Sequence, residues 1–231
     1  MKRIWRGSIK VIRVKKGLAA LLSILLILCL NGCSTINLLT QGEFDASGYV
    51  NGILDSTYKG VFDQYIKLTE DTEENAQKAY DAVMEAKAES FANFVSVNLT
   101  DETKAKFIEY SKQIYQNAKY EVKDAIKTDN GFTVDIIISP MTIMQSIATE
   151  GEIFVNDFND KNSNGDFADL TEEEFEAEYA KGIMQVFDNN ISNIQYADPV
   201  TITVNVTLQD DKVYSMASDE FTKIDSEMLQ Q

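Results

Sequence analysis

The chain has 231 residues, with 37 acidic against 21 basic side chains and no histidine, so its formal net charge is −16. This charge excludes a nucleic-acid-binding protein of the ordinary kind, because phosphates are bound by clustered Lys and Arg side chains. The lack of histidine excludes Ser-His-Asp and Cys-His catalysis and zinc sites that need imidazole.

The first 32 residues have the pattern of a bacterial signal peptide. Residues 1–16 carry seven basic side chains and no acidic one, and residues 17–30 form an uncharged apolar run. A run of 14 residues is shorter than the about 20 that span a bilayer, which favours a signal peptide over a permanent anchor. It ends in Leu30-Asn31-Gly32-Cys33, which resembles the lipobox of bacterial lipoproteins, although Asn31 departs from the usual small or aliphatic residue.

The lipobox resemblance implies cleavage after Gly32 and a diacylglyceryl group, with palmitate-type acyl chains, on Cys33. The alternatives are an ordinary secretory cleavage site and an uncleaved anchor. If the chain is cleaved after Gly32, the mature protein (residues 33–231) has 14 basic and all 37 acidic side chains, which gives a net charge of −23. We therefore expect a lipid-anchored protein on the extracytoplasmic face of the cell membrane, whose partners are a protein or a cationic ligand, and not nucleic acid.

After a short tether over residues 33–43, apolar side chains recur at helical spacing. The first stripe predicts one continuous helix: Val50, Leu54, Tyr58, Phe62 and Ile66. The second predicts another: Tyr80, Met84, Ala88, Phe91 and Val95. The third stripe runs from Phe107 to Ala118. Three helices are therefore expected before the first strand.

The spacing then changes to two, which is typical of strands with one buried face. Residues 120–127 and 132–139 alternate in this way around a Thr-Asp-Asn-Gly turn, and residues 200–208 and 213–216 predict a second hairpin. Two helices are expected between the hairpins and one after them. The order ααα-ββ-αα-ββ-α predicts an α+β fold with helices packed on a four-stranded antiparallel sheet. We expect a single domain over residues 44–231, or two similar halves, 44–139 and 140–231.

Alternation also predicts a polar sheet face, which is a candidate binding surface if the helices leave it open. The expected members of this face are Thr133, Asp135, Thr201, Thr203, Asn205 and Thr207. The alternative is an ordinary solvated face, as antiparallel sheets commonly have.

An acidic segment, Asp160 to Glu174, allows two interpretations. Its first half resembles a calcium loop, with candidate ligands Asp160, Asn162, Asn164, Asp166 and Glu172. Calcium is thus a candidate ligand, and no other cofactor is expected. However, the twelfth position of the loop is Thr171 and not glutamate. In the other interpretation, residues 162–165 form a turn and Thr171 to Glu174 form a capping box that begins the next helix.

The whole pattern is similar to small surface lipoproteins of Gram-positive bacteria of the Clostridia type, through the lipobox, "FDASGYVNGILDSTYKGVFDQYI" over 44–66 and "PVTITVNV" over 199–206. The expected sheet also loosely resembles cystatin and NTF2-like sheets. Neither resemblance implies an activity. We expect a binding or interaction module and not an enzyme; the alternatives are a calcium-stabilised surface module and a carboxylate-dependent hydrolase.

Overall fold

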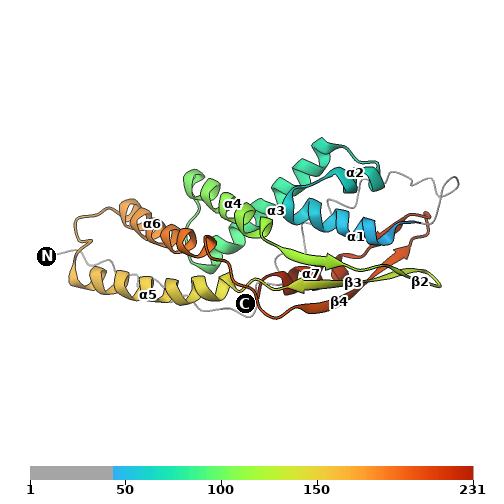
Figure 1. Cartoon of the computed structure of the whole chain (residues 1–231). Coiled ribbons are helices and arrows are strands. Elements are labelled where there is room, and N and C mark those ends of the chain that lie inside the picture. The colour runs from blue at the N-terminus through green and yellow to red at the C-terminus, as the bar shows by residue number, and fades with distance from the viewer. Residues whose placement is uncertain (1–43, 231) are drawn as a thin grey trace.

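A computed structural model describes residues 44–230 of the chain (Figure 1). It confirms the predicted α+β class, with helices packed on one curled antiparallel sheet. The helices are α1 (Ala46–Leu54), the π-helix η3 (Asp55–Lys59), α2 (Asp63–Thr69), α3 (Glu73–Phe94), α4 (Asp101–Gln116), α5 (Ile143–Asn164), α6 (Glu172–Ile191) and α7 (Ser218–Met228). The strands are β1 (Lys119–Val122), β2 (Ile126–Thr128), β3 (Gly131–Ser139), β4 (Val200–Leu208) and β5 (Tyr214–Met216).

The sheet is built around two long strands from the two halves of the chain. Strands β3 and β4 pair antiparallel from Gly131 opposite Thr207 to Ile138 opposite Val200. Strands β1 and β2 both pair with β3 on its other side, and β5 pairs with the end of β4. The order β1-β3-β4-β5, with β2 beside β3, is the composite sheet that the alternating segments predicted.

The strand predicted over residues 120–127 is interrupted. Residues 123–125 separate β1 from β2, although the Lys123 N–H still donates to the Asp135 carbonyl of β3 at 2.8 Å. The Ser47 hydroxyl of α1 bonds to both ends of this interruption. The hydroxyl donates to the Lys123 carbonyl at 3.0 Å and accepts from the Ala125 N–H at 2.8 Å. An exposed sheet edge invites pairing with another chain, so this contact with α1 satisfies two backbone groups that would otherwise offer such an edge.

The first predicted helix is also broken. Its stripe from Val50 to Ile66 continues through α1 and η3, but Gly60 takes a left-handed conformation with φ of 65° and ends the π-helix. A side chain on Gly60 would meet the Tyr80 ring at 3.2 Å. The prediction that Tyr58 and Phe62 are buried is therefore confirmed. The prediction of a single continuous helix is wrong.

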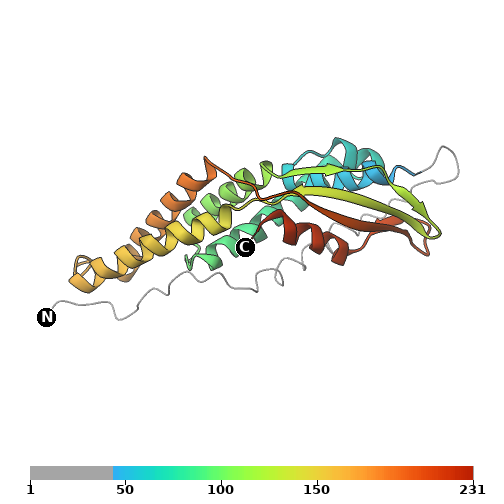
Figure 2. The same cartoon turned by 60° about the horizontal axis from the view of Figure 1, so that its bottom comes forward.

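Helices α5 and α6 form an antiparallel hairpin that extends from one end of the sheet (Figures 1 and 2). At its base, the Met141 backbone bonds to Met228 and Gln230 at the end of α7, and the neighbouring Thr142 N–H bonds to the Gln195 carbonyl. The hairpin core is aromatic, with the Phe158 ring centroid 5.1 Å from Phe175 and 5.5 Å from Tyr179. The molecule is consequently elongated, with the sheet and the helical hairpin arranged end to end.

Candidate functional site

The polar face of the sheet brings together all six residues that the sequence predicted for it. Across β3 and β4, Thr133 lies opposite Asn205, and Asp135 lies opposite Thr203. Thr201 and Thr207 occupy the same face, because opposed positions share a face in an antiparallel ladder. The set therefore forms two parallel rows on adjacent strands.

This face is open to solvent. Thr201, Thr203 and Asn205 are exposed, and Thr133, Asp135 and Thr207 are partly exposed. The opposite face carries Val134, Ile136, Val204 and Val206, which are buried against the helices. Helix α1 packs on the sheet at β1 and β3, and α7 lies beside β4 (Figure 2).

Hydrogen bonds organise the centre of the face. The Thr203 hydroxyl donates to the Asp135 carboxylate at 2.6 Å. The Asn205 amide donates to Glu220 of α7 at 2.6 Å, and Lys223 in the next turn of α7 bonds to the same carboxylate. The face thus presents hydroxyl, amide and carboxylate groups whose positions are fixed by the strands and by α7, which suits recognition of a polar partner surface.

The first half of the candidate calcium loop is helical. Helix α5 continues through Asn164, so Asp160, Asn162 and Asn164 are helical residues. Two residues along a helix are about 200° apart around its axis, so Asn162 lies on the opposite side from the other two: it is buried, whereas Asp160 and Asn164 are exposed. Asp166 follows the end of the helix and Glu172 begins α6. Within residues 44–230, no three acidic side chains gather into a group that could hold a metal ion.

The predicted turn over residues 162–165 is wrong, because α5 ends only at Gly165, where φ of 87° provides the left-handed helix cap. The predicted capping box is confirmed. The Thr171 hydroxyl accepts from the Glu174 N–H at 3.2 Å, and the Glu174 carboxylate accepts from the Thr171 N–H at 2.8 Å. These bonds lower the pKa of Glu174. The composition of the segment is therefore explained by a helix start.

We expect calcium to have no specific effect on stability. Thermal unfolding of the purified protein in EDTA, in millimolar calcium and in millimolar magnesium checks this, because both cations screen the acidic surface to a similar extent. The Asp160→Ala variant is the matched control. A rise in Tm that is specific to calcium and absent from Asp160→Ala would contradict the helical geometry described above.

One polar cluster in the core was not predicted from the sequence. The Lys87 ammonium of α3 lies 2.5 Å from the Asp225 carboxylate of α7, and the two side chains are only 4% and 10% exposed. The Tyr58 hydroxyl donates to the same carboxylate oxygen at 3.2 Å. Burial lowers the pKa of Lys87, which the Asp225 charge opposes. Burial, together with that charge, raises the pKa of Tyr58 well above its usual value, so its hydroxyl remains a donor.

The sequence feature that could have indicated this cluster is Lys87, a charged residue within a stripe of apolar residues. Lys87 is adjacent to Ala88 and one helical turn from Met84 and Phe91, all of them buried. In the structure its ammonium also lies 4.7 Å from the centre of the Tyr115 ring. The cluster ties α3, η3 and α7 together beneath the sheet, and its contacts are those of a structural ion pair.

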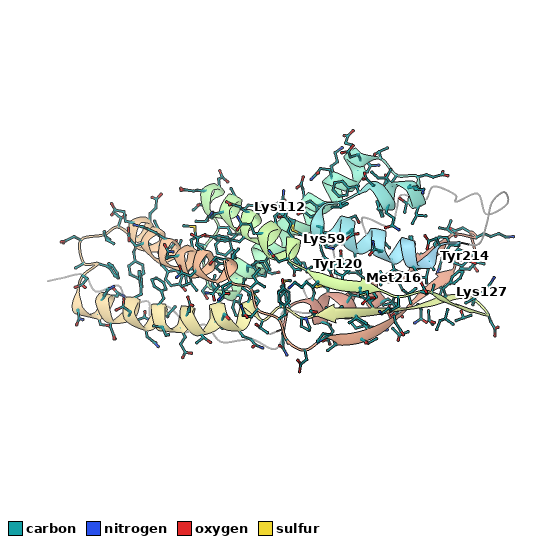
Figure 3. All side chains as sticks on the ribbon, in the orientation of Figure 1. Lys59, Lys112, Tyr120, Lys127, Tyr214 and Met216 are labelled. Carbon is teal, nitrogen blue, oxygen red and sulfur yellow. The ribbon has the colours of Figure 1, made fainter. Side chains whose placement is uncertain are left out.

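A second polar contact joins η3 to the edge of the sheet. The Tyr120 hydroxyl of β1 donates to the Asp55 carboxylate at 2.6 Å, and Lys59 pairs with Asp55 at 3.0 Å. The Lys59 ammonium lies 4.1 Å from the centre of the Tyr120 ring. Both residues are labelled in Figure 3. Burial and the Asp55 charge raise the pKa of Tyr120. The π-helix thus places Asp55 at the hydroxyl and Lys59 over the ring of one strand side chain.

Comparison with solved structures identifies a similar fold. The crystal structure of a "putative lipoprotein (ycdA)" from Bacillus subtilis has a TM-score of 0.56 and 15% sequence identity to this chain. The match covers 81% of this chain and 56% of that one, so this chain corresponds to little more than half of the other protein. At this identity the similarity establishes a shared fold. It does not bear on a Clostridia-type origin or on a likeness to cystatin and NTF2-like sheets.

No protein-family model matches the chain, and no curated protein matches it in sequence. The predicted signal peptide, with Leu30, Asn31, Gly32 and Cys33, lies outside the described residues. Among residues 44–230, no helix combines the length and apolar character needed to cross a membrane.

Proposed function

We propose that this protein is a membrane-anchored lipoprotein on the extracytoplasmic face, and that it binds a protein partner through the open polar face of its sheet without catalysing a reaction. The observation that carries the proposal is the open face itself. Six polar residues are aligned on two central strands, and all six are exposed or partly exposed to solvent.

Two further observations support the anchor. The Leu30-Asn31-Gly32-Cys33 sequence has the order of a lipobox. The protein with the similar fold is itself described as a putative lipoprotein. A diacylglyceryl group supplies two acyl chains, and one chain alone gives only marginal membrane binding.

The chemistry of the face favours a protein partner. On β4, hydroxyl and amide groups alternate with apolar residues of the buried face, and Asp135 on β3 supplies a carboxylate beside them. The two central strands place no aromatic ring on this face, whereas sugars are usually bound by stacking on aromatic rings. Short hydroxyl and amide side chains donate and accept hydrogen bonds, as a polar protein surface requires.

Site-specific photo-crosslinking in cells that produce the full chain tests this proposal. A photoreactive amino acid at exposed Thr203 should give a discrete adduct in the membrane fraction. Thr201→Arg, which places a long charged side chain on the same face, should abolish that adduct. Because Thr201 is exposed, this substitution should leave the melting temperature nearly unchanged.

The matched control is the same photoreactive residue at Ser163, an exposed position in α5. Equal adducts from positions 203 and 163, or no adduct from position 203, would contradict binding by the face. Metabolic labelling with palmitate should mark the unaltered chain and not Cys33→Ser, and equal labelling of the two would contradict the lipid anchor.

A further inference from the structure

We propose that the molecule is oriented on the membrane, with one end of the sheet facing the lipid bilayer and the α5–α6 hairpin held away from it. The end in question, here named the turn end, carries the β2–β3 turn (residues 129–130) and the β4–β5 turn (residues 209–213). Lys127 and Tyr214 mark it in Figure 3. This inference rests on the proposed lipid anchor at Cys33.

The described chain begins at the turn end. Phe44, the first described residue, stacks on Tyr214 of β5 with ring centroids 4.5 Å apart, and its ring lies 6.0 Å from that of Phe132. Phe132 follows Gly131 at the start of β3, immediately after the β2–β3 turn. These contacts place Phe44, the residue that follows the tether, beside the two turns.

The tether is short compared with the molecule. Residues 34–43 separate Cys33 from Phe44, and a fully extended chain of this length spans at most about 40 Å. From the turn end, β3 (9 residues) and α5 (22 residues) follow one another toward the hairpin tip. They span about 30 Å and about 33 Å respectively, and the elements lie end to end (Figures 1 and 2). The tether therefore cannot reach a bilayer at the hairpin tip, which excludes the inverted orientation.

Charge decides between an upright molecule and one that lies flat. Residues 143–191, which form the hairpin, contain twelve acidic and two basic side chains. The segments at the turn end, residues 123–131 and 207–214, contain four acidic and three basic side chains. A bilayer with anionic lipids repels the hairpin when it comes within about 10 Å of the surface. An upright orientation keeps the hairpin beyond that distance.

The turn end also carries apolar side chains that suit the headgroup region. Ile126 of β2 is 66% exposed, and Leu208 at the end of β4 is 36% exposed. Lys127 lies next to Ile126 in the same strand, and long lysine side chains can extend their charge to the lipid headgroups. The bilayer surface is thus the partner that this end of the molecule fits.

Two isoleucines provide a matched pair of reporters. Ile126 lies near the turn end, Ile153 lies in α5, and the two are 66% and 67% exposed. The chain has two cysteines, Cys29 and Cys33; the first leaves with the signal peptide and the second is blocked by lipid. An introduced cysteine is then the only free thiol, so Ile126→Cys and Ile153→Cys can each carry a donor fluorophore.

The experiment uses the full chain, processed in a bacterial host, purified from membranes and reconstituted in phosphatidylethanolamine–phosphatidylglycerol vesicles that contain an acceptor-labelled lipid. The label is added after reconstitution with a membrane-impermeant reagent. Energy transfer to the acceptor lipid should be several-fold more efficient from position 126 than from position 153. Equal melting temperatures of the two variants establish that both are folded.

The outcomes separate the two proposals. If the protein co-floats with the vesicles but both positions transfer energy equally, or position 153 transfers more, the orientation is wrong and the anchor stands. If the processed chain does not co-float, or carries no acyl group on Cys33, the anchor is wrong and the orientation fails with it.

Discussion

Replacing Asp225 by alanine is expected to destabilise the protein by about 3–5 kcal/mol, because it leaves the Lys87 charge buried without its partner. The Tyr58 hydroxyl also loses its acceptor. This is a large part of the 5–15 kcal/mol that typically separates folded from unfolded domains. Urea unfolding followed by circular dichroism measures the change, with Asp225→Ala compared with the unaltered chain.

Two controls show whether charge or packing is responsible. The double variant Lys87→Met, Asp225→Leu removes both charges and keeps similar volumes, so it should recover most of the lost stability. Glu74→Ala breaks the exposed pair between Glu74 and Lys78, whose side chains are 77% and 70% exposed, and should change stability little. Equal losses in the double and single variants would mean that the cluster contributes by shape alone.

Gly131→Ala should have a comparable effect through the backbone. Gly131 begins β3 with φ of 148°, and a β-carbon there would lie 2.1 Å from the Val206 carbonyl oxygen of β4. Strain at such a φ costs about 1–3 kcal/mol, and the contact with a backbone oxygen adds to it, because neither strand can move without losing ladder hydrogen bonds. We expect a loss of at least about 3 kcal/mol, measured by urea unfolding.

The neighbouring Asn130 provides the control for Gly131. It is exposed, it belongs to the same turn, and it has no positive φ, so Asn130→Ala should cost less than about 1 kcal/mol. A small loss for Gly131→Ala, similar to that of Asn130→Ala, would show that β3 and β4 can separate at this end. That result would also make the turn end more adaptable than the structure indicates.

Periodic patterns predicted the parts of this protein that depend on local spacing. Alternation over 132–138 and 200–208 identified both faces of β3 and β4, and with them every residue of the polar surface. The capping box at Thr171 and Glu174 was predicted because both bonds join residues three apart. By contrast, the resemblance of residues 160–172 to a calcium loop was misleading, because the buried stripe of α5 continues through Phe158 and Asn162 and keeps these residues helical.

Features that depend on distant partners left weaker signals. Lys87 and Asp225 are 138 residues apart, so neither the burial of the lysine nor its partner follows from the neighbouring sequence. A β-carbon at the Gly60 break would meet the Tyr80 ring of α3, and the gap between β1 and β2 is stabilised by Ser47. The amino-acid sequence by itself determined the fold class and the two faces of the sheet, since these follow from periodicity, and its lipobox-like motif predicts the lipid anchor. Only the tertiary structure decided where strands and helices break, which charges are buried together and which end of the molecule adjoins the tether, because these depend on contacts between residues far apart in the chain.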